Sequence, residues 1–459
     1  MSENTNSSPN SSPHSSSNSS PNPSPHSSPN SYEGMSDTEM FIEDYNRFTE
    51  RVQRHFEFRR EQQESRRRRR RRTYIERNRE IGEARLFNDY FSEQSVYTDY
   101  QFRQRFRMRK HLFLRIVNDL ENRYPYFQRS RDCTGRNSCT PLQKCTAALR
   151  MLAYGVSADQ LDENLRMSAP TILNCTRNFV AAIREMYGPY YLRKPNVTDT
   201  ARLLRIGERR GFPGMLGSID CMHWEWKNCP VGWQGMFTRG DIGSPTIILE
   251  AVASQDLWIW HAFFGFAGAN NDITVLNNSN LFVRELQNQA PEVNYNVNGR
   301  HYNIGYYLAD GIYPQWATFV KTIRLPQGDK AKLFAQHQES ARKDVERAFG
   351  VLRARFSIVR GPARMWDTPT LKDIMYACII LHNMIVEDER DDYEGDYEYE
   401  DIDGPTNIST DDVSHGVDSL PEFEEILQIR SNLHNRQMHN QLQHDLVEHI
   451  WQKFGGNSD

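Results

Sequence analysis

The sequence of 459 residues lacks an apolar run long enough to cross a membrane, which takes about 20 residues. The nearest candidates, Trp258 to Ala269 and Ile374 to Val386, are shorter and contain His261 and His382. The first residues also lack the basic start and apolar stretch of a secretory signal. We therefore expect an intracellular protein that makes no contact with a membrane.

Cysteines are few, and their pattern excludes a disulfide framework. There are seven of them, an odd number, and no CxxC pair occurs. An intracellular chain of this kind keeps its thiols reduced. Cys221, His223 and Cys229 are zinc-ligand types, but they lack a fourth ligand and their spacing fits no common structural site. We expect no structural zinc.

The net charge of -4 conceals a strong segregation of charge. Of the first 30 residues, 13 are Ser, 6 are Pro and 6 are Asn, a composition that cannot form a core. Residues 51–110 carry 19 Lys or Arg against 9 Asp or Glu, whereas residues 387–403 carry 11 acids and one Arg. We predict a disordered tail over residues 1–84 and an acidic linker over residues 387–420.

Seven consecutive arginines stand in the basic segment. They are Arg66, Arg67, Arg68, Arg69, Arg70, Arg71 and Arg72. Closely spaced guanidiniums pair with phosphate oxygens and displace counterions, and such runs also serve as nuclear import signals. We interpret the run as an import or phosphate-binding segment and expect a nuclear protein, with some in the cytoplasm. The alternative is a solvated linker.

Residues 85–200 have the pattern of a helical, helix-turn-helix-like region. Thr140 can cap a helix that starts at Pro141, Ser157 can start a second, and Ser168 can cap a third. The third helix has a buried stripe, and its opposite face would point towards a DNA groove. That face carries Thr171, Asn174, Arg177 and Asn178. The alternative is a plain helical bundle that never touches DNA.

After Arg210 the periodicity changes to that of strands. Aromatic and branched residues bounded by Gly, Asn and Asp predict three strands in an antiparallel meander, then a helix, a fourth strand and a short fifth strand. The predicted ranges are 217–226, 245–253 and 257–266 for the meander, 272–287 for the helix, 304–309 for the fourth strand and a part of 316–323 for the fifth. The fourth strand ends at Asp310.

A helix predicted from about Glu339 to Phe356 carries an acid at the rim of its apolar stripe, Glu346. Arg342, Gly350 and Arg353 lie at i−4, i+4 and i+7 from this acid. We expect Glu346 to face the sheet edge rather than open water. Arg342 and Arg353 are then candidates for contacts with DNA.

The order of these elements matches an α/β fold of the RNase H-like type, with a mixed sheet over residues 201–386. In such a fold the first and fourth strands are neighbours, so Asp220 and Asp310 can meet despite 89 intervening residues. Glu346 then approaches from the packed helix. We predict a further helix over residues 421–459, which docks on the core or on a second subunit.

Three convergent carboxylates repel each other unless cations lie between them. Oxygen ligands suit Mg²⁺ or Mn²⁺, and two such ions can activate a water or a 3′-hydroxyl and stabilise the leaving oxygen of a phosphodiester. We therefore predict that Asp220, Asp310 and Glu346 are catalytic residues and ligands of two divalent cations. His223 and the nearby tryptophans are interpreted as strand packing.

Five ordered motifs in the sequence resemble the PIF/Harbinger family of DDE transposases and their domesticated relatives, in the plant-type branch. They are GSIDCMHWEWKNCP (217–230), GANNDITVLNNSNLF (268–282), YYLADGIYP (306–314), SARKDVERAFGVLRARF (340–356) and LHNMIVEDE (381–389). The resemblance covers roughly residues 86–389 and extends to LQHDLVEHIW near the C-terminus.

The resemblance implies an RNase H-like nuclease whose DDE triad is Asp220, Asp310 and Glu346. The family uses divalent metal to cut double-stranded DNA at transposon ends and to join the 3′ ends to target DNA. It also implies a Myb-like accessory protein as a partner, and we expect a homo-oligomer. The alternative is a domesticated, catalytically silent DNA-binding or chromatin-associated adaptor.

Overall fold

The computed structural model describes residues 47, 49–55, 57, 75–287, 289–390 and 423–457. The chain divides into two compact units, Met1–Glu76 and Arg77–Asp459. In the first unit, residues 49–55 are helical. The arginine run Arg66–Arg72 and most of the predicted acidic linker lie outside the described residues, so the roles given to them stay predictions.

The second unit begins with helices that the sequence predicted in part. They are α2 (Arg79–Tyr90), α3 (Asp99–Phe106), α4 (Lys110–Arg123), α5 (Pro141–Tyr154), α6 (Ala158–Leu165), α7 (Ala169–Tyr191) and α8 (Val197–Arg209). Thr140 and Gln143 form a reciprocal capping box at the start of α5, and Ser157 accepts from a backbone N–H of α6. The predicted starts of both helices are confirmed.

A mixed sheet of five strands follows. The strands are β1 (Met215–Glu225), β2 (Thr246–Ala253), β3 (Ile259–Ala267), β6 (Tyr306–Ala309) and β7 (Phe319–Lys321), in the spatial order β3-β2-β1-β6-β7. β1, β2 and β3 pair antiparallel, whereas β1, β6 and β7 pair parallel. The predicted mixed α/β class, the meander and the neighbouring first and fourth strands are confirmed.

The other elements connect or cover this sheet. They are α9 (Val231–Phe237), α10 (Asp272–Asn278), α11 (Val283–Leu286), the hairpin β4 (Tyr295–Val297) and β5 (Arg300–Tyr302), α12 (Asp329–Arg355), α13 (Ser357–Arg360), α14 (Thr368–Asp388), α16 (Phe423–Leu433), α17 (Arg436–Phe454) and a 3₁₀ turn (Gly455–Asn457). None of the described helices is both apolar enough and long enough to span a bilayer.

Three helix predictions need correction. The single helix expected over residues 421–459 is two helices, α16 and α17, with a break at His434 and Asn435. The helix expected over residues 272–287 is two short helices, α10 and α11, separated by Ser279–Phe282. The helix expected from Glu339 starts ten residues earlier, at Asp329. Its first turns carry Lys330 and Lys332, so they lack the continuous apolar stripe on which the prediction depended.

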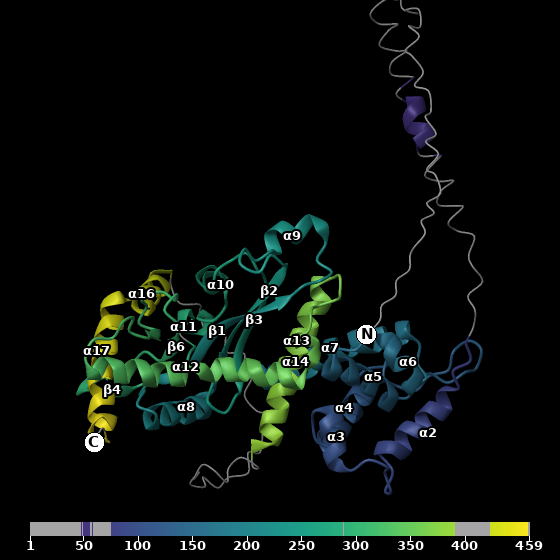
Figure 1. Ribbon diagram of the computed structural model, residues 1–459, viewed down its shortest axis with the longest axis horizontal. Coiled ribbons are helices and arrows are strands. Elements are labelled where there is room, and N and C mark those ends of the chain that lie inside the picture. Colours follow the sequence, from purple (N-terminus) through teal and green to yellow (C-terminus); the bar gives the residue numbers. More distant parts are fainter. Residues whose placement is uncertain are drawn as a thin grey trace, which may run out of the picture. The chain divides into compact units, whose positions relative to one another are not determined.

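The sheet has one helical layer on each face. α12 crosses one face of the sheet, as Figure 1 shows, and contacts β1, β2 and β6. On the other face Ile219, Tyr307 and Phe319 pack against Leu276 of α10. Residues of β1 therefore alternate between the α12 face and the α10 face.

The first helices and the sheet share one hydrophobic core. Phe106 and Phe179 of the helical region belong to the same buried cluster as Trp224 of β1, Ala251 of β2 and Ile380 of α14. α7 lies along α14, which packs in turn on β3 and α12. The position of α12, and of everything on it, thus depends on the helical region as well as on the sheet.

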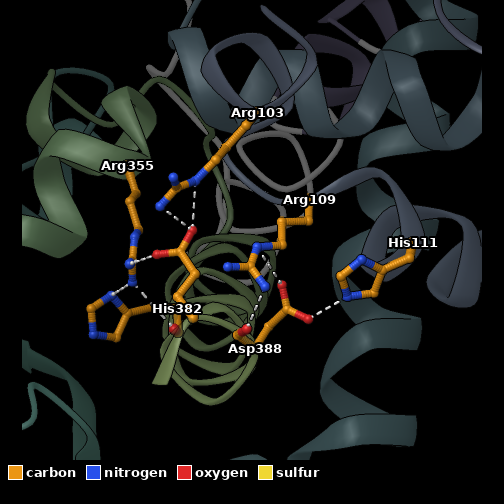
Figure 2. Close-up of polar contacts among 7 residues, drawn as sticks. Arg103, Arg109, His111, Arg355, His382 and Asp388 are labelled. Carbon is orange, nitrogen blue, oxygen red and sulfur yellow. Dashed lines mark hydrogen bonds and ion pairs between the residues drawn. The ribbon is translucent and has the colours of Figure 1, made fainter. Parts of the chain in front are cut away.

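Ion pairs tie the end of α14 to the helical region (Figure 2). Glu389 is 3% exposed. Its carboxylate forms ion pairs with the guanidiniums of Arg103 from α3, at 2.7 Å, and Arg355 from α12, at 3.1 Å. Arg109 donates to the backbone oxygen of Asp388 at 3.1 Å. We call this set the α14 joint: Arg103, Arg109, His111, Arg355, His382, Asp388 and Glu389.

Candidate functional site

Asp220 points from the middle of β1 towards α12. The hydroxyl of Ser218, two residues earlier, donates to the backbone oxygen of Ala341 on α12 at 3.1 Å. Alternation along the strand gives Asp220 the same face. Its side chain is 21% exposed, so most of it is covered by the protein.

Asp310 follows the last residue of β6 and lies level with Asp220. Ser218 pairs with Leu308 in the parallel ladder of β1 and β6, so each acid stands two residues beyond its member of this pair. One oxygen of Asp310 accepts the backbone N–H of Ile312 at 2.6 Å, which holds the carboxylate in the turn after the strand.

Glu346 comes from the middle of α12 and is more open than expected. Its side chain is 42% exposed, so the prediction that it avoids open water is wrong. The cause is its place at the rim of the buried stripe, where Val345 and Phe349 are covered but Glu346 is not. Gly350, one turn further on, has open space where a Cβ would lie.

Arg342 links the first and third acids. The same Nη1 atom lies 2.8 Å from Oε1 of Glu346 and 3.6 Å from Oδ2 of Asp220. The guanidinium is only 19% exposed. Arg342 is therefore an ion-pair partner of both carboxylates, whereas the sequence analysis proposed it as a contact for DNA.

Asp272 is a fourth acid near this group that sequence reasoning missed. It is the first residue of α10, after the capping residue Asn271. Its charge acts on Asp220, the charge of Asp310 acts on it, and its carboxylate also interacts with Cys221. The signal available in the sequence was an Asp directly after a helix-capping Asn, within the stretch 268–282.

Burial shifts the pKa of two acids, Asp220 and Asp272. It raises the pKa of Asp220 to about 6, although the backbone N–H of Cys221 and the charge of Arg342 act in the opposite direction. Burial likewise raises the pKa of Asp272, with a further contribution from Asp310. Cations near these carboxylates lower the cost of keeping them ionised.

The chemistry of the donor set suits a divalent cation, since hard oxygen ligands converge from β1, the end of β6 and α12. Across the described residues, however, no three side chains of the His, Cys, Asp and Glu types are close enough to hold one metal ion. The guanidinium of Arg342 pairs with two of these acids, Asp220 and Glu346.

The predicted DNA-facing residues of α7 lie on its open side in part. Asn174 and Arg177 are exposed, while Thr171 and Asn178 are half-buried. Thr171 contacts the hydroxyl of Ser168 at 2.8 Å, and Ser168 makes no backbone cap, contrary to prediction. The structure does not bring α7 and the carboxylates into contact with each other.

Two other residues take the places that sequence reasoning gave them. Arg353 is exposed on α12, two turns beyond Glu346. The imidazole of His223 is 2.9 Å from the hydroxyl of Thr246, and burial lowers its pKa to about 4. A neutral imidazole paired with a neighbouring strand agrees with a packing role.

Comparison with known proteins gives matches over the same region. The family described as "Plant transposon protein" matches residues 189–393, and a domain of unknown function matches residues 82–121. Protein ALP1-like of Arabidopsis thaliana is 25% identical over 256 residues, an alignment that covers 54% of this chain and 61% of that relative. No solved structure matches the chain significantly. All four acids described above lie inside the family match.

Proposed function

We propose that the chain, which is similar to plant transposon proteins and to a protein ALP1-like, is a PIF/Harbinger-type, transposase-derived protein and a DDE-type nuclease that cuts phosphodiester bonds in double-stranded DNA. The proposed reaction includes cutting at transposon ends and joining of the 3′ ends to target DNA. One observation carries the proposal. Asp220 and Asp310 lie at matching positions on the adjacent parallel strands β1 and β6, and the helix that bears Glu346 packs on these strands.

The proposed fold of the catalytic region is RNase H-like. The strand order β3-β2-β1-β6-β7, with the first three strands antiparallel and the last three parallel, supports this assignment. The order leaves the β1–β6 junction at the centre of the sheet. Acids at this junction are rigidly held, because each strand there has a neighbour on both sides.

In the proposed mechanism, Asp220, Asp310 and Glu346 would hold divalent cations. Bound Mg²⁺ or Mn²⁺ supplies activation of the attacking water or 3′-hydroxyl and stabilisation of the leaving oxygen. Asp220 must be ionised to act as a ligand, and its raised pKa makes this sensitive to pH. Asp272 adds negative charge beside Asp310 and strengthens the attraction for cations.

We further propose that the helical region holds DNA, with Asn174 and Arg177 of α7 as phosphate or base contacts. The arginine run Arg66–Arg72 would direct the protein to the nucleus. A Myb-like protein and a second copy of the chain are the proposed partners, on the basis of the family alone.

The test is cutting of supercoiled plasmid by the purified full chain with Mg²⁺ or Mn²⁺. We expect nicking by the natural protein and none by Asp220→Asn. Asp329→Asn is the matched control, because that carboxylate is on α12 but is 85% exposed. Equal nicking by Asp220→Asn would discard the site, and salt-sensitive DNA binding without any nicking would favour the silent adaptor.

A further inference from the structure

We propose that Arg342 is a built-in competitor of the divalent cation, whose guanidinium must leave Asp220 and Glu346 before a metal ion can bind between them. The inference rests on the proposed nuclease function and adds a control step to the same site. It also gives the displaced guanidinium a second position, on a phosphate of the DNA substrate.

The geometry gives Arg342 the place of a cation. One nitrogen atom contacts carboxylate oxygens of two different elements, at 2.8 Å on α12 and at 3.6 Å on β1. The side chain is 19% exposed, so the sheet and the helix enclose most of it. Glu346 is i+4 from Arg342 on the same helix, a spacing that favours the pair.

A metal ion and this guanidinium exclude each other. An ion of the size of Mg²⁺ needs its oxygen ligands at about 2.0–2.1 Å. The two carboxylate oxygens lie 2.8 Å and 3.6 Å from the same guanidinium nitrogen, so an ion that takes both as ligands needs the space that this nitrogen fills, and the guanidinium must move out. Fixed positive charge beside the ion would also repel it, and strongly so in a partly buried site.

The surroundings allow Arg342 to leave. The side chain is long and stands on a helix surface, so rotation about its own bonds can carry the guanidinium outwards without a change in the backbone. Glu346 next to it is 42% exposed, and Gly350 leaves the next turn of α12 open. A released guanidinium at this rim suits a phosphate oxygen, which it can bind through two N–H groups.

Cation binding and DNA binding should therefore support each other. A phosphate that holds Arg342 away from the acids frees them for metal, and a metal that displaces Arg342 frees it for phosphate. The coupling must be equal in both directions, because it is a property of one thermodynamic cycle. DNA-free protein would then bind metal weakly and cut little.

The test measures Mn²⁺ affinity of the full chain by calorimetry, without DNA, at constant pH and salt. We expect Arg342→Gln to bind Mn²⁺ at least about tenfold more tightly than the natural protein, since the competing charge is gone. Arg342→Lys should lie between the two, because lysine keeps the charge but has no planar fork. Lys343→Gln removes an exposed charge from the next position and should change the affinity by less than about twofold.

A second measurement adds a short DNA duplex. In the natural protein the duplex should tighten Mn²⁺ binding several-fold, and in Arg342→Gln this gain should disappear. If Arg342→Gln fails to fold, as judged by circular dichroism, Arg342→Lys and the duplex effect decide the outcome.

The results separate this inference from the nuclease proposal. Equal Mn²⁺ affinity in the natural protein and the Arg342 variants, with binding lost in Asp220→Asn, would overturn the competitor role and leave the nuclease proposal standing. No Mn²⁺ binding in any variant would overturn both.

Discussion

Ser218 of β1 and Leu308 of β6 face each other in a parallel ladder, and this pairing sets the level at which two acids leave the sheet. The register shifts between Met215 and Gly217, just before the pair. Gly217 has a φ of 150°, and a Cβ added there would lie 2.8 Å from the backbone oxygen of Ala253 on β2. A residue without a side chain thus allows the shift that brings Asp220 to its place.

Gly217→Ala should lower the free energy of unfolding by about 1–3 kcal/mol, because of this contact and the unfavourable φ. Gly350→Ala is the matched control, since nothing lies within 4 Å of its added Cβ in the middle of α12. That change should raise stability by about 0.5–1 kcal/mol. Urea unfolding measures both, and changes of the same sign would contradict the argument.

Substitutions of Asp310 and Asp272 should distinguish a metal ligand from an acid that only adds negative charge nearby. Asp310→Asn should lower metal-dependent nicking at least about 100-fold, because it removes a proposed cation ligand. Asp272→Asn should lower it by about tenfold, as expected for a group that acts on the ligands from outside. Plasmid nicking rates at saturating Mn²⁺ measure both, and a larger effect at Asp272 would reverse the two roles.

The α14 joint should contribute to the stability of the whole second unit. Glu389→Gln leaves Arg103 and Arg355 without their shared carboxylate, at a position that is 3% exposed. We expect a loss of about 2 kcal/mol, since Arg103 can still reach water. Glu424→Gln on the exposed side of α16 should change stability by less than about 0.5 kcal/mol. Equal urea midpoints for both variants would show that the joint contributes nothing.

His382 should make the fold sensitive to acid. Its ring is fully buried between Arg355 and the backbone oxygen of Leu257, and burial lowers its pKa to about 3. Below about pH 6.5 the imidazole of His382 takes up a proton in the unfolded chain but not in the folded protein. The free energy of unfolding therefore decreases as pH falls.

The magnitude follows from the same linkage. Between pH 7 and pH 4.5 this one ring should cost about 2–3 kcal/mol. His382→Gln cannot take up the proton, so its stability should fall less steeply over that range. Urea unfolding at several pH values measures the two slopes, and parallel slopes would remove His382 from the acid sensitivity.

Arg177 on the open face of α7 should contribute to DNA binding through phosphate. Arg177→Gln should weaken binding of a duplex and reduce the slope of log affinity against log salt by about 1. Arg430→Gln, an exposed arginine on α16, is the control and should leave the slope unchanged. Fluorescence anisotropy from low to moderate salt gives the slopes, and identical values for all three proteins would argue against the α7 surface.

Local signals in the sequence predict much of this fold. Thr140 with Pro141 marks the start of α5 because capping chemistry acts within a few residues. The run of aromatic and branched residues predicts β1 to within two residues, and the break after Ala309 gives the end of β6. The levels of Asp220 and Asp310 follow once the strand order is assumed.

Other features depend on contacts that no local pattern contains. Arg103 meets Glu389 across 286 positions, and Arg342 meets Asp220 across two elements. Which cation an acid pairs with depends on the final packing, because many arginines of equal reach compete for it. Asp272 was missed for the same reason, since only the docking of α10 on the sheet brings its charge near Asp310.

The core that joins Phe179 of α7 to Ile380 of α14 has a consequence for how such a chain can be rearranged. A chimera could take its N-terminal helices from one protein and its sheet from another. The side of α14 that packs on α7 would then face a foreign surface. Recombination at the start of the sheet should therefore yield insoluble products unless α14 is exchanged along with the helices. We therefore expect related proteins to inherit the N-terminal helices and the sheet together.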